Sequence, residues 1–131
     1  MGLRSAATLP RVGARICLAT YTRIDPAHLA AFSSTVINGL LRGKLGFRGV
    51  VVSDSLTATA VSSMSPGQRA IDFLLAGGDL IVARSATAMV AMVAAVQARA
   101  VTYSKFATLV NNAALLVLEA KQAAGLLPCS G

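Results

Sequence analysis

One carboxylate of the chain stands where a catalytic group would be expected. The sequence has only five acidic residues and one histidine. One of the acids, Asp54, follows a valine run in GFRGVVVSDSL, at the point where a strand gives way to a loop. Ligands of parallel α/β proteins bind at the carboxyl ends of strands, so Asp54 is a candidate for contact with a substrate. The alternative is that Asp54 caps a turn or the next helix, which is common for aspartate after a strand.

The cysteines and the histidine of the chain do not indicate a metal site or a disulfide framework. Cys17 and Cys129, together with His28, do not have the spacing of a zinc site, and two cysteines cannot form a disulfide framework. We therefore expect no metal and no cofactor. His28 follows an apolar run beside an Asp-Pro turn, and we expect it on the surface or at the rim of the site.

Apolar runs alternate with amphipathic segments along the chain, which predicts an α/β fold with parallel strands. This pattern alone does not separate an open doubly wound sheet from part of a (β/α)8 barrel. We expect three strands, over residues 15–21, 49–53 and 79–83. The first helix runs from Ser33 or Ser34 to Gly43 or Gly46, and the second begins with Ser65 as N-cap, Pro66 at its first position and Gln68 completing a capping box. After the third strand we expect a buried helix over 86–100 with Ser85 as N-cap, and then an amphipathic helix through Phe106 and Val117 that ends near Gly125.

Composition limits the partners. The net charge of +7 raises nucleic acid as a partner, but the basic residues are spread along the chain without a basic run or a stacking motif, so we expect none. No glycine-rich phosphate loop follows a strand, which disfavours a nucleotide-binding domain. We find no stretch long enough to span a membrane and no secretory signal at the N-terminus, and the compartment stays unassigned.

The stretch SSTVINGLLRGKLGFRGVVVSDSL, residues 33–56, resembles the signature of glycoside hydrolase family 3. AIDFLLAGGDLIVA and LLVLEAKQAAGLL are similar to the next βα unit and the closing helix of that family's barrel domain. The resemblance implies that residues 1–131 form one partial domain, the C-terminal portion of an incomplete (β/α)8 barrel. It also implies that Asp54 is the nucleophile of a retaining glycosidase.

Several departures from the family pattern refine this expectation. Ser55 and Ala58 stand where relatives carry a second acid and a methionine, and the missing tryptophan after Ser-Asp favours the β-N-acetylhexosaminidase branch. A carbohydrate with β-linked N-acetylglucosamine is then the expected substrate. The Lys-His-Phe-Pro-Gly segment that carries the acid/base of that branch is absent, and the context of His28 does not match it.

Two hypotheses about the function follow. The chain is a piece of a retaining hexosaminidase, inactive alone, or it is a non-catalytic assembly or carbohydrate-binding remnant. Only about half of the roughly 250 residues of a complete barrel are present. An incomplete barrel leaves an open sheet edge and inward-facing valines without partners, so we expect low stability or self-association.

Overall fold

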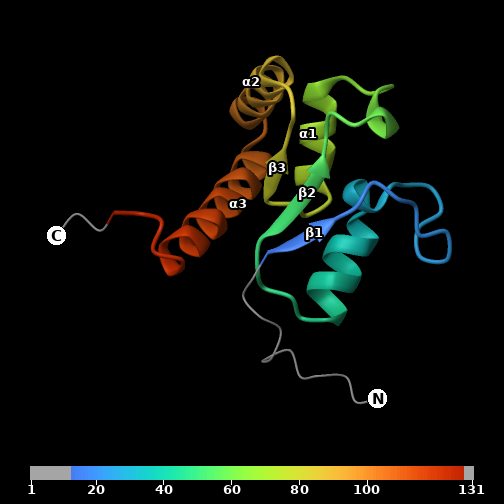
Figure 1. Ribbon diagram of the computed structural model, residues 1–131, viewed down its shortest axis with the longest axis horizontal. Coiled ribbons are helices and arrows are strands. Elements are labelled where there is room, and N and C mark those ends of the chain that lie inside the picture. Colours follow the sequence, from blue (N-terminus) through green and yellow to red (C-terminus); the bar gives the residue numbers. More distant parts are fainter. Residues whose placement is uncertain (1–12, 129–131) are drawn as a thin grey trace.

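The structure is a computed structural model that describes residues 13–128. Its centre is a three-stranded parallel sheet with the order β1 (Ala14–Ile16), β2 (Val51–Ser55) and β3 (Leu80–Val82). Helical segments connect the strands, and two long helices follow β3 (Figure 1). The helices are η2 (Ala30–Phe32), η3 (Thr35–Lys44), η4 (Thr59–Val61), α1 (Pro66–Leu75), α2 (Ala86–Thr102) and α3 (Ser104–Ala123). The expected α/β fold with parallel strands is confirmed.

The two faces of the sheet differ in burial. Val51 and Ser53 are fully buried on the face that packs against the helices. Arg15 lies level with Val52, and Val52 with Leu80, on the opposite face, which is open to solvent. Because side chains alternate along a strand, Asp54 belongs to the same open face as Val52. In a complete barrel this face would line the interior.

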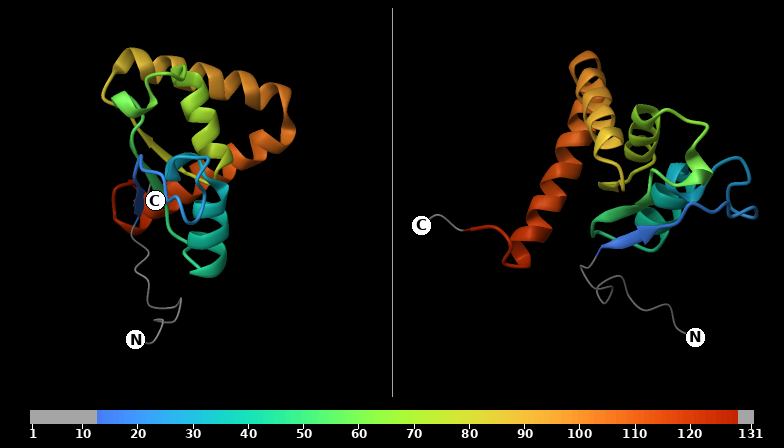
Figure 2. Two further views of the ribbon diagram at one scale, coloured as in Figure 1. Left: turned by 90° about the vertical axis from the view of Figure 1, so that its right-hand side faces the viewer. Right: turned by 45° about the horizontal axis from the view of Figure 1, so that its top comes forward.

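The hydrophobic core lies between the sheet and the helices. Ile37 from η3, Phe73 from α1 and Met92 from α2 pack around Val51 of the central strand, and all four are almost completely buried. Each side chain of this size contributes about 1.5–3 kcal/mol by its burial. Helix α1 occupies a central place in this layer (Figure 2). Its packing fixes the central strand, which carries Asp54 near its carboxyl end.

The helix caps agree in part with the expectations. Ser65 Oγ accepts a hydrogen bond from Gln68 N, and Ser85 Oγ accepts one from Ala88 N, so both N-caps are confirmed. Of the expected capping box at α1, the bond from Gln68 N to Ser65 Oγ is present, and the Gln68 side chain donates through Nε2 to Asp72 Oδ1 at 2.7 Å. This bond joins side chains four residues apart, which are neighbours on one helix face.

The helix between β1 and β2 has a wider form than expected. It is a π-helix, and at its end Leu45 N donates to the carbonyl of Leu40, five residues earlier. Ser33 Oγ accepts a hydrogen bond from Val36 N at 3.1 Å, which confirms the expected role of this serine at the start of the helix.

Three strand boundaries expected from the sequence are corrected. The strand predicted over 49–53 is observed over Val51–Ser55, so Asp54 is one of its last residues and not the first residue of the loop. The strand predicted over 15–21 is paired only over Ala14–Ile16, because the chain then leaves the sheet and turns at Tyr21, whose carbonyl accepts from Ile24 N and Asp25 N. The strand predicted over 79–83 is likewise limited to Leu80–Val82.

Helix α2 is not buried as its alanine-rich sequence suggested. Met92 is its buried residue, whereas Val90 and Val101 are 70% and 90% exposed. The helix packs by one side against α1 and α3, and its other side faces solvent (Figure 2). Among the described helices, none is both long and apolar enough to cross a membrane.

Candidate active site

Asp54 lies at the carboxyl end of β2, the central strand of the sheet. The strand is parallel to both neighbours, so the loops that follow β1, β2 and β3 all leave the sheet at the same edge. The side chain of Asp54 is 37% exposed on the open face. A carboxylate in this place can reach a ligand, as required of a nucleophile.

Two hydrogen bonds hold the carboxylate of Asp54. Arg15 Nη2 donates to Oδ1 at 2.7 Å from the neighbouring strand, and Ser55 N donates to the same oxygen at 2.8 Å. Within residues 13–128, Oδ2 accepts no hydrogen bond from the protein. The bond from Arg15, followed by that from Ser55 N, holds the pKa of Asp54 below its ordinary value. Asp54 is therefore ionised at neutral pH, the state in which a carboxylate can attack.

The loop after Asp54 is tied to the loop after β3. Ser55 Oγ and Thr57 Oγ1 are 2.8 Å apart, and Arg84 N donates to Thr57 Oγ1 at 3.1 Å. Ser55 thus belongs to a hydrogen-bonded link between two loops. The link fixes the backbone that follows Asp54.

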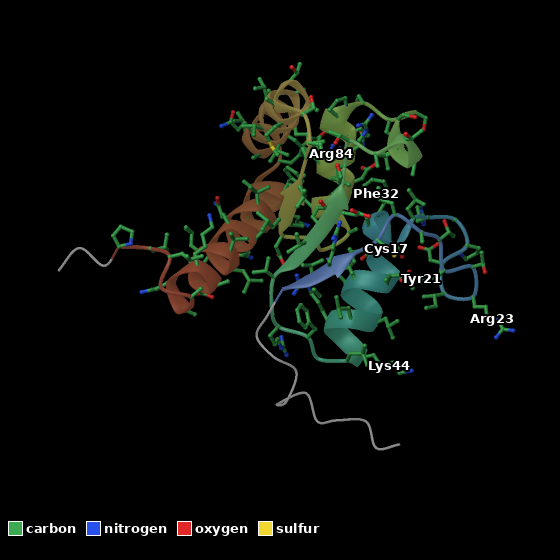
Figure 3. All side chains as sticks on the ribbon, in the orientation of Figure 1. Cys17, Tyr21, Arg23, Phe32, Lys44 and Arg84 are labelled. Carbon is green, nitrogen blue, oxygen red and sulfur yellow. The ribbon has the colours of Figure 1, made fainter. Side chains whose placement is uncertain are left out.

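The loop after β1 leaves the sheet at the same edge and then extends away from Asp54. Figure 3 shows Cys17 beside the end of β1, Tyr21 further out and Arg23 at the far turn of the loop. Cys17 Sγ and the Tyr21 hydroxyl are 3.3 Å apart, and this hydrogen bond raises the pKa of Tyr21 above its ordinary value. Tyr21 is therefore neutral at neutral pH.

His28 lies on the surface, as expected, and its partner is an aspartate of its own loop. His28 Nδ1 is 2.9 Å from Asp25 Oδ2, and Ser33 Oγ donates to the same oxygen at 2.7 Å. The bond from Ser33, and then that from His28, outweighs the opposing effect of burial and lowers the pKa of Asp25. Asp25 lies between the serine and the histidine, so His28 is not placed to activate Ser33. The cluster anchors the loop to the start of η3.

The other acids are engaged away from Asp54. Asp72 accepts from Gln68 on α1, and Asp79 accepts from Arg42 and from Val51 N at the opposite end of β2. Glu119 lies on α3. The five acidic side chains of the chain all lie in residues 13–128, and within that range no second acidic side chain is hydrogen-bonded to Asp54 or to a donor of Asp54. The same range contains no group of three or more His, Cys, Asp or Glu side chains placed to hold a metal ion.

The sequence analysis did not identify Arg15 as part of the site. The sequence does contain one indication, because Arg15 is a charged residue at the start of an apolar strand. Once the strands are paired, alternation of side chains places it on the same face as Val52 and Asp54. The pairing register itself cannot be read from one sequence.

The chain is similar to glycosidases of known structure. The model of the glycosyl hydrolase family 3 N terminal domain matches residues 12–116. The crystal structure of a β-N-acetylhexosaminidase from Beutenbergia cavernae is similar with a TM-score of 0.78 and 44% identity, over 84% of this chain and 33% of that one. A family 3 β-N-acetylglucosaminidase from Paenibacillus sp. gives a TM-score of 0.74 and 27% identity, over 89% of this chain and 23% of that one.

A characterised relative is similar over a shorter stretch. A β-N-acetylglucosaminidase/β-glucosidase from Cellulomonas fimi is 44% identical over 43 residues, which are 33% of this chain and 8% of the relative. The chain therefore spans a third or less of the length of each of these proteins.

Proposed function

Because this chain belongs to glycosyl hydrolase family 3, we propose that it supplies the nucleophile-bearing part of a retaining β-N-acetylhexosaminidase, with Asp54 as the nucleophile. The observation that carries the proposal is the ionised, half-exposed carboxylate at the end of the central parallel strand, held by Arg15 and Ser55 N. The names of the similar proteins favour a β-linked N-acetylglucosaminide as the substrate.

The chemistry has two steps. Asp54 attacks the anomeric carbon, the bond from that carbon to the leaving oxygen breaks, and an acid protonates the leaving oxygen. Water, deprotonated by the same group, then attacks the anomeric carbon and releases the sugar and the free carboxylate. The two inversions give net retention of configuration.

The acid/base group of this proposal lies outside the described residues. In retaining enzymes the two catalytic groups lie about 5–5.5 Å apart, and each other acid of this chain is bonded elsewhere or lies on α3. We propose that the chain alone is inactive, because loss of the proton donor costs about 10²- to 10⁴-fold in rate. Completion of the barrel by preceding strands would supply the missing group.

The test compares the 131-residue chain with a fusion in which the chain replaces the matching third of the Beutenbergia cavernae enzyme. A chromogenic N-acetyl-β-glucosaminide is the substrate. We expect turnover by the fusion, none by the chain alone, and a loss of several orders of magnitude in the Asp54→Ala fusion. Full activity of the Asp54→Ala fusion would overturn the proposal. A fusion that binds the sugar without turnover would instead favour the carbohydrate-binding alternative.

A further inference from the structure

The bond between Arg15 and Asp54 crosses from one strand to the next. Arg15 faces Val52 in the paired register, so Asp54 lies two residues further along the central strand. Two residues of a strand span about 7 Å, and the arginine side chain extends along the open face by this amount to reach Oδ1 at 2.7 Å. A side chain as short as serine or asparagine at position 15 could not make the contact.

From this geometry we infer that Arg15 is a positioning residue of the glycosidase site. It holds Oδ1 of Asp54 and leaves Oδ2 as the oxygen that attacks the anomeric carbon, a role that rests on the function proposed above.

The choice between the two carboxylate oxygens follows from their hydrogen bonds. Oδ1 receives both donors, Arg15 Nη2 and Ser55 N, and an oxygen that accepts two hydrogen bonds has less free lone-pair density for attack. The bond from Ser55 N is local, because it comes from the next residue along the chain. Arg15 is the long-range partner, and with Ser55 N it restricts rotation of the carboxylate about its last bond.

The hydrogen bond and the charge of Arg15 also keep the carboxylate of Asp54 ionised for attack. A guanidinium beside the carboxylate stabilises its ionised form, and it holds the pKa of Asp54 low. In the present chain the pair is open to water, with side-chain exposures of 73% for Arg15 and 37% for Asp54. Enclosure of this face by the remaining strands of a barrel would strengthen the attraction, because the surrounding dielectric constant falls.

The first test uses the intact 131-residue chain and follows the carboxyl carbon of Asp54 by NMR as pH is varied. Arg15→Met keeps a long side chain without the charge, Arg15→Lys keeps the charge with a single point of donation, and Arg23→Met is the matched control on the distant turn of the loop. We expect the titration midpoint of Asp54 to rise in Arg15→Met, to rise less in Arg15→Lys and to stay constant in Arg23→Met. An unchanged midpoint in a folded Arg15→Met chain would overturn the inference. Since Arg15 is largely exposed, the substitution removes no core contact.

The second test measures kinetics in the active fusion. Misplacement of a reacting group by about 1 Å costs on the order of a hundredfold, so Arg15→Met should lower kcat by about ten- to a hundredfold with little change in KM. Arg15→Lys should restore part of kcat, and Arg23→Met should match the parent. An unaltered kcat in Arg15→Met would overturn the positioning role and leave Asp54 as nucleophile. Full turnover after Asp54→Ala would instead remove the proposed function, whatever the effect at Arg15.

Discussion

Replacement of Arg42 by methionine should destabilise the fold strongly. Arg42 extends from η3 and donates to the carbonyl of Gly77 through Nε and Nη2, at 3.3 and 3.0 Å. It also donates to the carbonyl of Gly49 at 3.2 Å and to Asp79 Oδ2. Asp79 Oδ2 in turn accepts from Val51 N at 2.7 Å. One guanidinium thus joins η3 to the segments that enter β2 and β3.

The size of the effect follows from burial. The side chains of Arg42 and Asp79 are 23% and 8% exposed, so little water can replace the lost donors. Removal of the arginine leaves a nearly buried carboxylate with only Val51 N as partner. Breaking a buried pair in this way costs about 3–5 kcal/mol. A domain has about 5–15 kcal/mol of stability in total, so the variant should lose a large part of it.

Urea unfolding followed by circular dichroism measures this loss. Arg48→Met, at an exposed position close by, is the matched control and should stay within about 0.5 kcal/mol of the parent. Adding Asp79→Asn to Arg42→Met should recover part of the loss, because it removes the unpaired charge while retaining an acceptor for Val51 N. An Arg42→Met chain as stable as the control would refute the reasoning that this guanidinium is the main link between these segments.

Three further predictions concern other parts of the structure. Gly78→Ala should destabilise the fold by about 1–3 kcal/mol in urea unfolding, because the added methyl group would overlap the ring of Phe73, which is fully buried; an unchanged midpoint would contradict this packing. Ser53→Ala should cost about 1–3 kcal/mol, since its buried Oγ accepts from Val82 N at 2.9 Å, and unaltered stability would show that this N–H finds another acceptor. The lowered pKa of Asp25 means that its ionised form stabilises the fold above the ordinary aspartate pKa of about 3.9, and that this contribution is lost as pH falls through the lower pKa of the folded state. The urea midpoint of Asp25→Asn should therefore fall less on acidification than that of the parent. An equal fall of the two midpoints would contradict this prediction.

Local features of the fold could be predicted from the sequence. The apolar runs around Val51 and Ile81 predicted neighbouring parallel strands, and Ser65 and Ser85 predicted the starts of two helices, because each signal lies within a few residues. The extent of β1 could not be predicted. Strand length depends on the partner, and the pairing with β2 ends at Ile16.

Contacts between distant residues account for what the sequence did not indicate. Arg15 and Asp54 are 39 positions apart, and Arg42 and Asp79 are 37 apart, so neither pair has a local signal. The burial of α2 was overestimated for the same reason, because the number of neighbours around a helix depends on the whole fold. Asp54 itself was identified from its place after a strand and from the family resemblance, and its role as nucleophile stays a proposal.

The most direct measurement is the site of covalent attachment of the sugar. An activated N-acetylglucosaminide that forms the glycosyl-enzyme quickly and releases it slowly would be incubated with the active fusion, and digestion followed by mass spectrometry would locate the modified residue. We expect one sugar on the peptide that contains Asp54, bound through its carboxylate, and no label after Asp54→Ala. A label on another residue, or turnover without any covalent species and with inversion at the anomeric carbon, would contradict it.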